Sequence, residues 1–169
     1  NALIALALAL AGMIVYVALR YEFNYALAGI LALIHDAMIA LGVFLLAGRE
    51  VSLPVVAGLL TVIGYSINDT IVIFDRIREE RHLHPDRPFQ QVVNESLNRT
   101  LSRTILTSLT TFLVVVVMFM MGGIAINDFM LVIGVGIIVG TYSSIYLASP
   151  MIVRWHEWHC RKHPAGRRA

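Results

Sequence analysis

Residues 64–78 read GYSINDTIVIFDRIR, an apolar stretch that holds one acid and ends in a burst of charge. The acid, Asp69, lies several residues before the charged exit, among polar side chains that include Tyr65, Ser66 and Asn68. A carboxyl group inside an apolar helix is costly, so it needs either a partner or a function. The surroundings of Asp69 therefore decide what the protein can do.

The composition is that of a membrane protein. Hydrophobic residues make up 58% of the 169 residues and charged residues only 14%, whereas about a quarter of the residues in soluble domains are charged. A helix needs roughly 20 apolar residues to cross a bilayer. Five segments meet this need, at about residues 2–19, 25–47, 53–74, 105–121 and 129–153. The sequence therefore predicts an all-α membrane protein with five spanning helices.

The basic residues are unevenly distributed. Twelve of the 13 Lys and Arg residues lie at Arg20, in residues 76–103 and in residues 154–168. Five consecutive spans place these three stretches on one face of the membrane and Arg49 on the other. By the positive-inside rule the basic face is cytoplasmic. We expect a transmembrane domain over residues 1–153, with an amphipathic cytoplasmic helix at about 88–103, and a basic cytoplasmic tail over residues 154–169.

Two further charged positions lie in or beside the spans. The pair His35-Asp36 is near the middle of the second span, where it either stabilises packing or takes part in function. Arg103 opens the fourth span and either extends to the lipid headgroups or turns inward to Asp69. The second arrangement is feasible because both residues lie toward the cytoplasmic ends of consecutive antiparallel spans. Such a pair could take up and release a proton as its members separate and approach.

The last span and the tail add features of packing. Asn127-Asp128 is predicted to cap the fifth span. Within it, Gly136, Gly140 and Ser144 recur every four residues, a pattern that lets helices approach closely. In the tail, four residues could share one helix face, namely His156, His159, Cys160 and His163. A basic, frayed terminus explains them more simply than a metal site, so we expect no bound metal.

No enzyme motif is present. The sequence has no HExxH pair, nucleophile elbow, P-loop or dinucleotide-binding fingerprint. The single cysteine excludes an internal disulfide framework. We therefore expect neither an enzyme nor an organic cofactor. What remains is a small set of ionisable groups at membrane depth, and such groups are typical of a path for protons.

Residues 64–79 closely resemble the fourth-helix signature of the SecF family. The His35-Asp36 pair and the stretch Leu101-Ser102-Arg103-Thr104 are also similar to that family, and the resemblance covers nearly the whole chain. SecF is the partner of SecD in bacterial protein export, and both resemble the resistance-nodulation-division transporters. The resemblance implies a SecF membrane part, or the carboxyl-terminal half of a fused SecDF. The five spans would be the second to sixth helices of a six-helix half.

The resemblance also implies roles for individual residues. Asp69 would accept protons and Arg103 would be its charge partner or gate, with protons as the coupling ion. The resemblance implies a supporting polar role for five further residues, Asp36, His35, Asn68, Tyr65 and Ser66. The chain begins without initiator Met or basic leader, and we expect the first helix and a periplasmic domain of the family to belong to a longer protein.

The implied setting is the bacterial inner membrane. The expected partners are SecD or its fused half, the SecYEG channel with SecA, YajC, the secretory preprotein and membrane lipid, with no nucleic acid. Two alternatives remain open, since fold does not fix function. One is half of a proton-coupled efflux or lipid transporter of the same fold. The other is a scaffold whose polar groups only pack helices.

Overall fold

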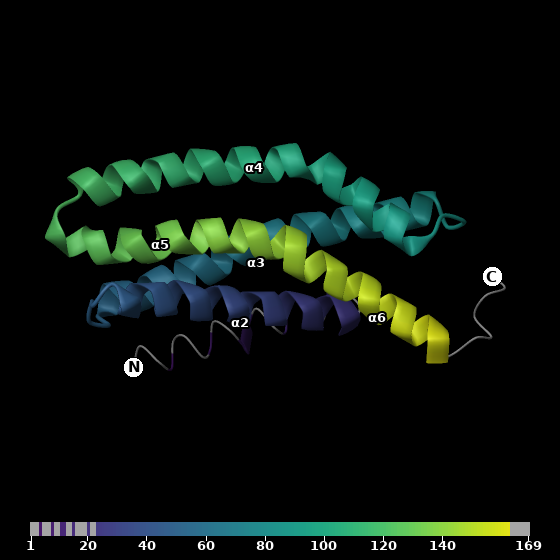
Figure 1. The fold of residues 1–169 in the computed structure, drawn as a ribbon, viewed down its shortest axis with the longest axis horizontal. Coiled ribbons are helices and arrows are strands. Elements are labelled where there is room, and N and C mark those ends of the chain that lie inside the picture. The colour runs from purple at the N-terminus through teal and green to yellow at the C-terminus, as the bar shows by residue number, and fades with distance from the viewer. Residues whose placement is uncertain are drawn as a thin grey trace.

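The computed structural model describes residues 23–162, together with residues 4, 8, 11, 12, 15 and 20. Every element in this described part is helical (Figure 1), which agrees with the all-α prediction. The elements are α2 (Phe23–Leu46), α3 (Leu53–Leu83), α4 (Phe89–Met121), α5 (Ile124–Ser143), a π-helical segment (Ser144–Ala148) and α6 (Ser149–Lys162). The first predicted span, residues 2–19, lies mostly outside the described residues.

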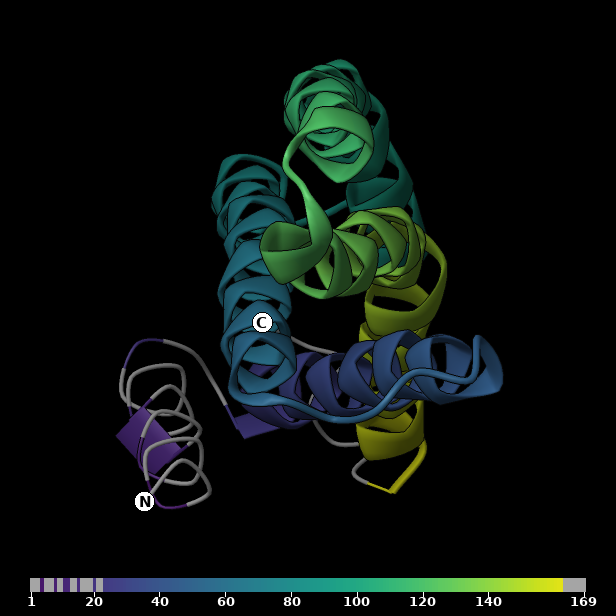
Figure 2. The same cartoon turned by 90° about the vertical axis from the view of Figure 1, so that its left-hand side faces the viewer.

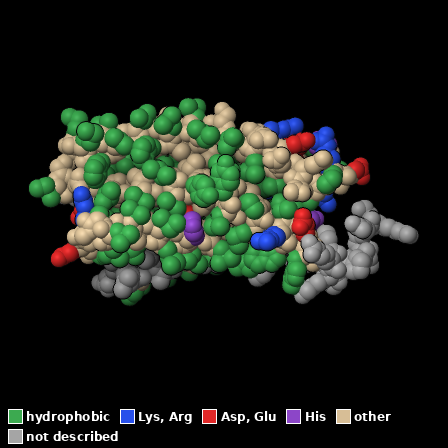
Figure 3. Space-filling view, viewed as in Figure 1, with side chains coloured by type: hydrophobic (Ala, Val, Ile, Leu, Met, Phe, Trp, Pro, Cys, Tyr) green, Lys and Arg blue, Asp and Glu red, His purple; other side chains and the backbone are tan. Residues whose placement is uncertain are grey.

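Four helical stretches in the described part are long and apolar enough to cross a bilayer. They are Tyr25–Leu46, Leu53–Leu83, Phe89–Met121 and Ile126–Trp158. Charged side chains gather toward the two ends of the long axis, while apolar side chains cover much of the middle (Figure 3). The end that carries residues 76–99 is called the basic end below, and the end that carries Arg49 the opposite end. This distribution is the one that a membrane-spanning bundle requires.

The helices α3 and α5 form the centre of the bundle. Both run from the opposite end toward the basic end, while α2 and α4 lie on either side of this pair (Figure 2). One apolar core includes Phe74 and Ile152, and a second includes Phe44 and Val132. Along α2, along α3, and from α5 into the segments that follow it, buried polar residues come between members of the two cores. The bundle therefore contains a polar layer between two apolar cores.

The helices α3 and α4 are longer than the predicted spans. The span predicted over residues 53–74 continues as one helix to Leu83, and the helix predicted over residues 88–103 is continuous with the next span. Neither Pro nor Gly occurs between Phe89 and Met121, so no residue type that breaks a helix interrupts the backbone hydrogen bonds there. Residues 89–103 are therefore the first part of one continuous helix, and Val92 and Val93 on it are buried in the bundle.

The small residues of α5 lie directly against α3. A Cβ atom added at Gly136 would lie 2.1 Å from Cγ2 of Val62, and one added at Gly140 would lie 3.1 Å from Cβ of Ser66. One step further, the hydroxyls of Ser144 and Thr70 are 2.9 Å apart. Residues four apart on α5 thus contact residues four apart on α3, as expected for helices that run in the same direction. Glycine at position 136 permits the close approach.

At the basic end, a buried carboxylate joins α3 to α4. The side chain of Glu80 is only 1% exposed. Its Oε1 accepts hydrogen bonds from Arg76, at 2.7 Å, and from Arg99 on α4. Its Oε2 lies 3.9 Å from Nε2 of His84. These contacts hold the two helices together beside the turn that connects them.

Replacing Glu80 by glutamine is expected to lower the free energy of unfolding by about 1–3 kcal/mol, because two guanidinium groups would then meet a neutral amide. Arg99 is about half exposed, so water offsets part of the loss. Chemical unfolding of the detergent-solubilised protein measures the change. Glu79→Gln is the matched control, since Glu79 also binds Arg76 but is 56% exposed. Equal effects of the two substitutions would contradict the assignment.

At the opposite end, Arg49 ties three segments together. Its Nη1 donates to Oδ1 of Asn127 at 2.5 Å and also contacts the carboxylate of Asp128. Asn127 in turn donates to the carbonyl of Phe119, at 3.0 Å. The predicted helix cap at Asn127-Asp128 is therefore wrong. The helix α5 begins earlier, after Gly123, whose φ of 74° glycine adopts without strain.

Candidate functional site

Asp69 is buried where α3 faces α4. Its side chain is 4% exposed, and its carboxyl group lies beside Ser108 of α4. In the described part of the structure, its Oδ2 has no hydrogen-bond partner. A buried polar oxygen is normally hydrogen-bonded, and exceptions call for an explanation such as a chemical role. An acid with a free oxygen in an apolar bundle can accept a proton there.

Ser108 connects Asp69 to hydroxyl groups of two other residues. Tyr65 donates to Ser108 at 3.3 Å, and Ser108 shares a hydrogen bond of 2.7 Å with Thr141 on α5. We call Asp69, Tyr65, Ser108 and Thr141 the Asp69 cluster. Hydroxyls can both donate and accept, so such a chain can pass a proton between neighbours. The adjacent Thr107 behaves differently, since its exposed hydroxyl bonds to carbonyls of its own helix.

Arg103 does not form an ion pair with Asp69. Its side chain is exposed, and among the described residues no salt bridge within 4.0 Å joins it to this carboxyl group. It is nevertheless near enough to act on Asp69 electrostatically. The two residues predicted to pair are thus neighbours without direct contact. Asn68 is also exposed.

A second buried acid lies on the other side of α3. Asp36 on α2 is fully buried, and its Oδ2 accepts hydrogen bonds from Ser66 of α3 at 2.5 Å and from Ser143 of α5 at 2.7 Å. Its Oδ1 lies 3.1 Å from Nδ1 of His35. We call these four residues the Asp36 cluster. Every predicted polar residue except Asn68 and Arg103 therefore belongs to one of the two clusters.

Each cluster includes one residue of α5, close to the point where the α-helix gives way to the π-helical segment. Thr141 belongs to the Asp69 cluster and Ser143 to the Asp36 cluster, and the π-helical segment begins at the next residue, Ser144. Pro150 follows closely and has no N–H to continue the helical hydrogen bonds. The hydroxyl of Ser149 donates to the carbonyl of Ser144 at 3.1 Å. Single π-helical turns inside α-helices are frequent at functional sites.

Thr70, Thr141 and Ser143 are not among the residues predicted for the site. The signal that could have revealed the last two is the polar stretch over residues 141–144, which interrupts an otherwise apolar span. Of the tail histidines and cysteine, His156 has a described side chain, and it belongs to neither cluster. His159, Cys160 and His163 lie outside the residues whose side chains are described.

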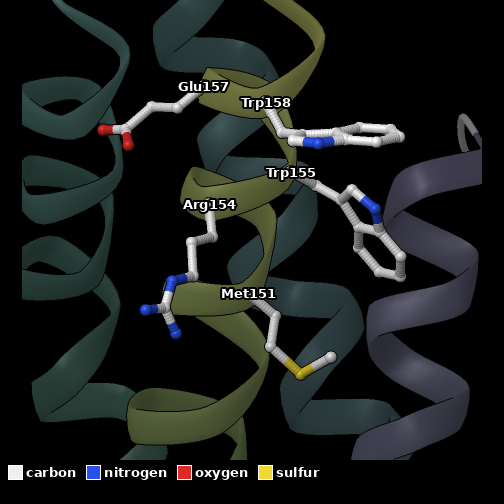
Figure 4. Close-up of a pocket in the computed structure, with 5 residues that line it drawn as sticks. All are labelled: Met151, Arg154, Trp155, Glu157 and Trp158. Carbon is white, nitrogen blue, oxygen red and sulfur yellow. The ribbon is translucent and has the colours of Figure 1, made fainter.

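A groove of about 830 Å³ runs along α6 at the basic end and is lined by Met151, Arg154, Trp155, Glu157 and Trp158. Arg154 and Glu157 point to one side of the helix, while the two tryptophans point to the other (Figure 4). No lining residue belongs to the Asp69 or Asp36 cluster. The groove is therefore separate from the candidate site.

Comparison with known families gives the context of these clusters. Residues 1–158 match the family described as "Protein export membrane protein SecD/SecF, C-terminal". The chain belongs to the SecD/SecF family. It is 50% identical over 162 residues to the protein translocase subunit SecF of Desulfurispirillum indicum. It is 48% identical over 155 residues to the protein translocase subunit SecDF of Thermus thermophilus.

Solved structures of SecDF share the fold. The crystal structure of SecDF from Thermus, described as a translocon-associated membrane protein, matches with a TM-score of 0.89 and 48% identity over 93% of this chain. A SecDF structure in a super-membrane-facing form matches with a TM-score of 0.87. The chain covers 52% of the SecF relative and 21% of the SecDF relative, against 94% and 92% of its own length. The chain thus spans about half the length of a SecF subunit.

Proposed function

We propose that this chain is the membrane domain of a SecF-type subunit that uses a proton gradient to assist protein export. Asp69 accepts the proton, and Arg103 is the charge that approaches it or withdraws from it. Family membership supports the link to export, since the relatives are named as protein translocase subunits. The observation that carries the proton coupling is the buried Asp69 with one carboxyl oxygen unpartnered among the described residues.

The separation of Asp69 and Arg103 fits one state of such a cycle. A buried carboxylate without a countercharge is unfavourable, so a proton on Asp69 is favoured while Arg103 stays away. An approach of Arg103 would stabilise the carboxylate and release the proton. The hydroxyls of Ser108, Tyr65 and Thr141 provide steps along which the proton travels to or from Asp69.

The proposal extends to partners and orientation. The second half of the bundle is SecD or a fused SecD domain, and the assembly works with the SecYEG channel, SecA and the emerging preprotein, with YajC as an accessory. The protein lies in the bacterial inner membrane with its basic end in the cytoplasm. Arg49, the basic residue at the opposite end, fits this orientation because Asp128 neutralises its charge.

The test is preprotein translocation into inverted membrane vesicles, with the full complex present or absent and with the proton gradient intact or collapsed by an uncoupler. We expect a stimulation that needs both the complex and the gradient. Stimulation that survives the uncoupler would refute proton coupling. No stimulation at all, together with gradient-driven movement of a small molecule or lipid, would favour a transporter of the same fold instead.

A further inference from the structure

We propose that Asp36 is a second proton-carrying group, and that its state of protonation controls how the junction between α5 and α6 is held. The proposal rests on the proposed proton-driven function and adds a second proton-binding group to it. The starting point is geometric. The carboxyl group of Asp36 is fully buried, and it receives hydrogen bonds from α2, α3 and the end of α5.

His35 connects Asp36 to the outside of the described bundle. Its imidazole is 37% exposed, while Asp36 beside it is 0% exposed. Among the described residues no Lys or Arg forms a salt bridge with Asp36. His35 is therefore the group through which a proton can enter, because imidazole accepts on one ring nitrogen and donates from the other.

The transfer can be written with every proton accounted for. At the start, Asp36 is a carboxylate and neutral His35 donates its Nδ1–H to Oδ1. A proton that arrives at the lone pair of Nε2 makes an imidazolium. The Nδ1–H bond then breaks as an Oδ1–H bond forms, which leaves a neutral carboxyl group and a neutral imidazole with its hydrogen on Nε2. One proton has been taken up, and release follows the same steps in reverse.

Protonation of Asp36 weakens the hydrogen bonds that join it to α3 and α5. The hydroxyls of Ser66 and Ser143 donate to Oδ2 in the structure. Hydrogen bonds to an ionised group are roughly twice as strong as those between neutral groups. Because Ser143 is the last residue of α5 and the π-helical segment follows it, a weaker bond loosens the junction that carries α6. Ser144 still holds this junction to Thr70.

The other ionisable groups on the neighbouring elements are placed differently. On α3, the carboxyl group of Asp69 lies beside Ser108 of α4, and Tyr65 donates to the same serine. Tyr142 and Tyr146 are exposed and stack on each other, with ring centroids 4.9 Å apart. The ionisable residues of α6 with described side chains are Arg154, His156 and Glu157. Asp36 is thus the buried acid whose hydrogen bonds reach the junction.

The direct test is infrared difference spectroscopy of the full complex in membranes during a pH titration. A protonated carboxyl group has its own absorption band, distinct from that of a carboxylate. In an Asp69→Asn background we expect a buried-carboxyl band that disappears when Asp36→Asn is added and persists with the control Asp75→Asn, since Asp75 is 47% exposed. A spectrum that Asp36→Asn leaves unchanged would overturn the proposal.

A second measurement reports on the junction between α5 and α6. Spin labels at Leu83→Cys and Glu157→Cys, in a Cys160→Ser background, report the distance between α3 and α6. We expect this distance to change with pH in the Asp69→Asn background, and Ser143→Ala to remove the change while the infrared band of Asp36 remains. Ser149→Ala is the control, since Ser149 bonds within the junction and not to Asp36. An unaltered pH response in Ser143→Ala would overturn the coupling.

A replacement variant and independence from the export assay keep the test decisive. If Asp36→Asn does not fold, His35→Gln replaces it, because glutamine fills the site without carrying a proton. The Asp36 band should then titrate more slowly after a pH jump, and an unchanged rate would overturn the role of His35. Neither readout requires protein export. A failure of gradient-driven translocation would therefore refute the proposed function without deciding whether Asp36 takes up a proton.

Discussion

Replacing Asp69 by asparagine is expected to abolish the part of preprotein translocation that depends on the proton gradient. Asparagine keeps the size and some hydrogen bonding of the side chain but cannot titrate. The side chain is 4% exposed, so few surface interactions would be altered. The measurement compares vesicles that carry the wild-type and variant complexes, each with and without an uncoupler. The gradient-independent activity of SecA should be unchanged.

Two further variants separate proton transfer from structure. Asp75→Asn removes a half-exposed acid from the same helix and should leave the stimulation intact. Asp69→Glu restores a titratable group with a longer arm and should recover part of the activity. If the Asp69→Asn complex assembles normally and still responds to the gradient, Asp69 is a packing residue. The scaffold alternative would then account for the polar layer.

Replacing Gly136 by leucine is expected to be the most destabilising change in the contact between α3 and α5. The first side-chain atom alone would lie 2.1 Å from Cγ2 and 2.5 Å from Cγ1 of Val62. The two helices would have to move apart, and the loss should be about 3 kcal/mol, the upper end of the usual range for overpacking. Unfolding of the protein by titration with a denaturing detergent measures the loss.

The matched control is Gly42→Leu, because a Cβ atom at Gly42 would meet no atom of another described helix within 4 Å. Its effect should stay within about 1 kcal/mol and could be stabilising, since leucine favours helices more than glycine does. Combining Gly136→Ala with Val62→Ala should recover part of the stability lost in Gly136→Ala alone. Similar unfolding of Gly136→Leu and Gly42→Leu would mean that the close contact contributes little.

The sequence predicts the helices well but their ends poorly. Apolar length identifies each span in the described part, because the cost of burying polar groups in lipid acts on whole segments. The ends depend on contacts between distant residues. Arg49, for instance, engages Asn127 and Asp128, and this removes them from the role of helix cap that their residue types suggest. Likewise, α4 carries no signal that would end it at the membrane surface.

The same distinction applies to the site. Asp69 and Asp36 stand out in the sequence because acids are rare in apolar spans. Their partners do not, since a serine or threonine in a span can bond to its own helix as readily as to a neighbour. Thr107 does the first and Ser108 the second, although they are adjacent. Only the packing of α4 against α3 and α5 decides between these outcomes, as it also decides that Arg103 stays outside.

The helix α4 is held at both of its ends, with the Asp69 cluster between the two attachments. At the opposite end, Asn127 donates to the carbonyl of Phe119. At the basic end, Arg99 binds Glu80, which lies on the same helix as Asp69. A helix fixed at both ends cannot swing away from Asp69, so a change in the contact between Asp69 and Ser108 would act on α4 as a small twist or bend that reaches the ion pair of Glu80 and Arg99.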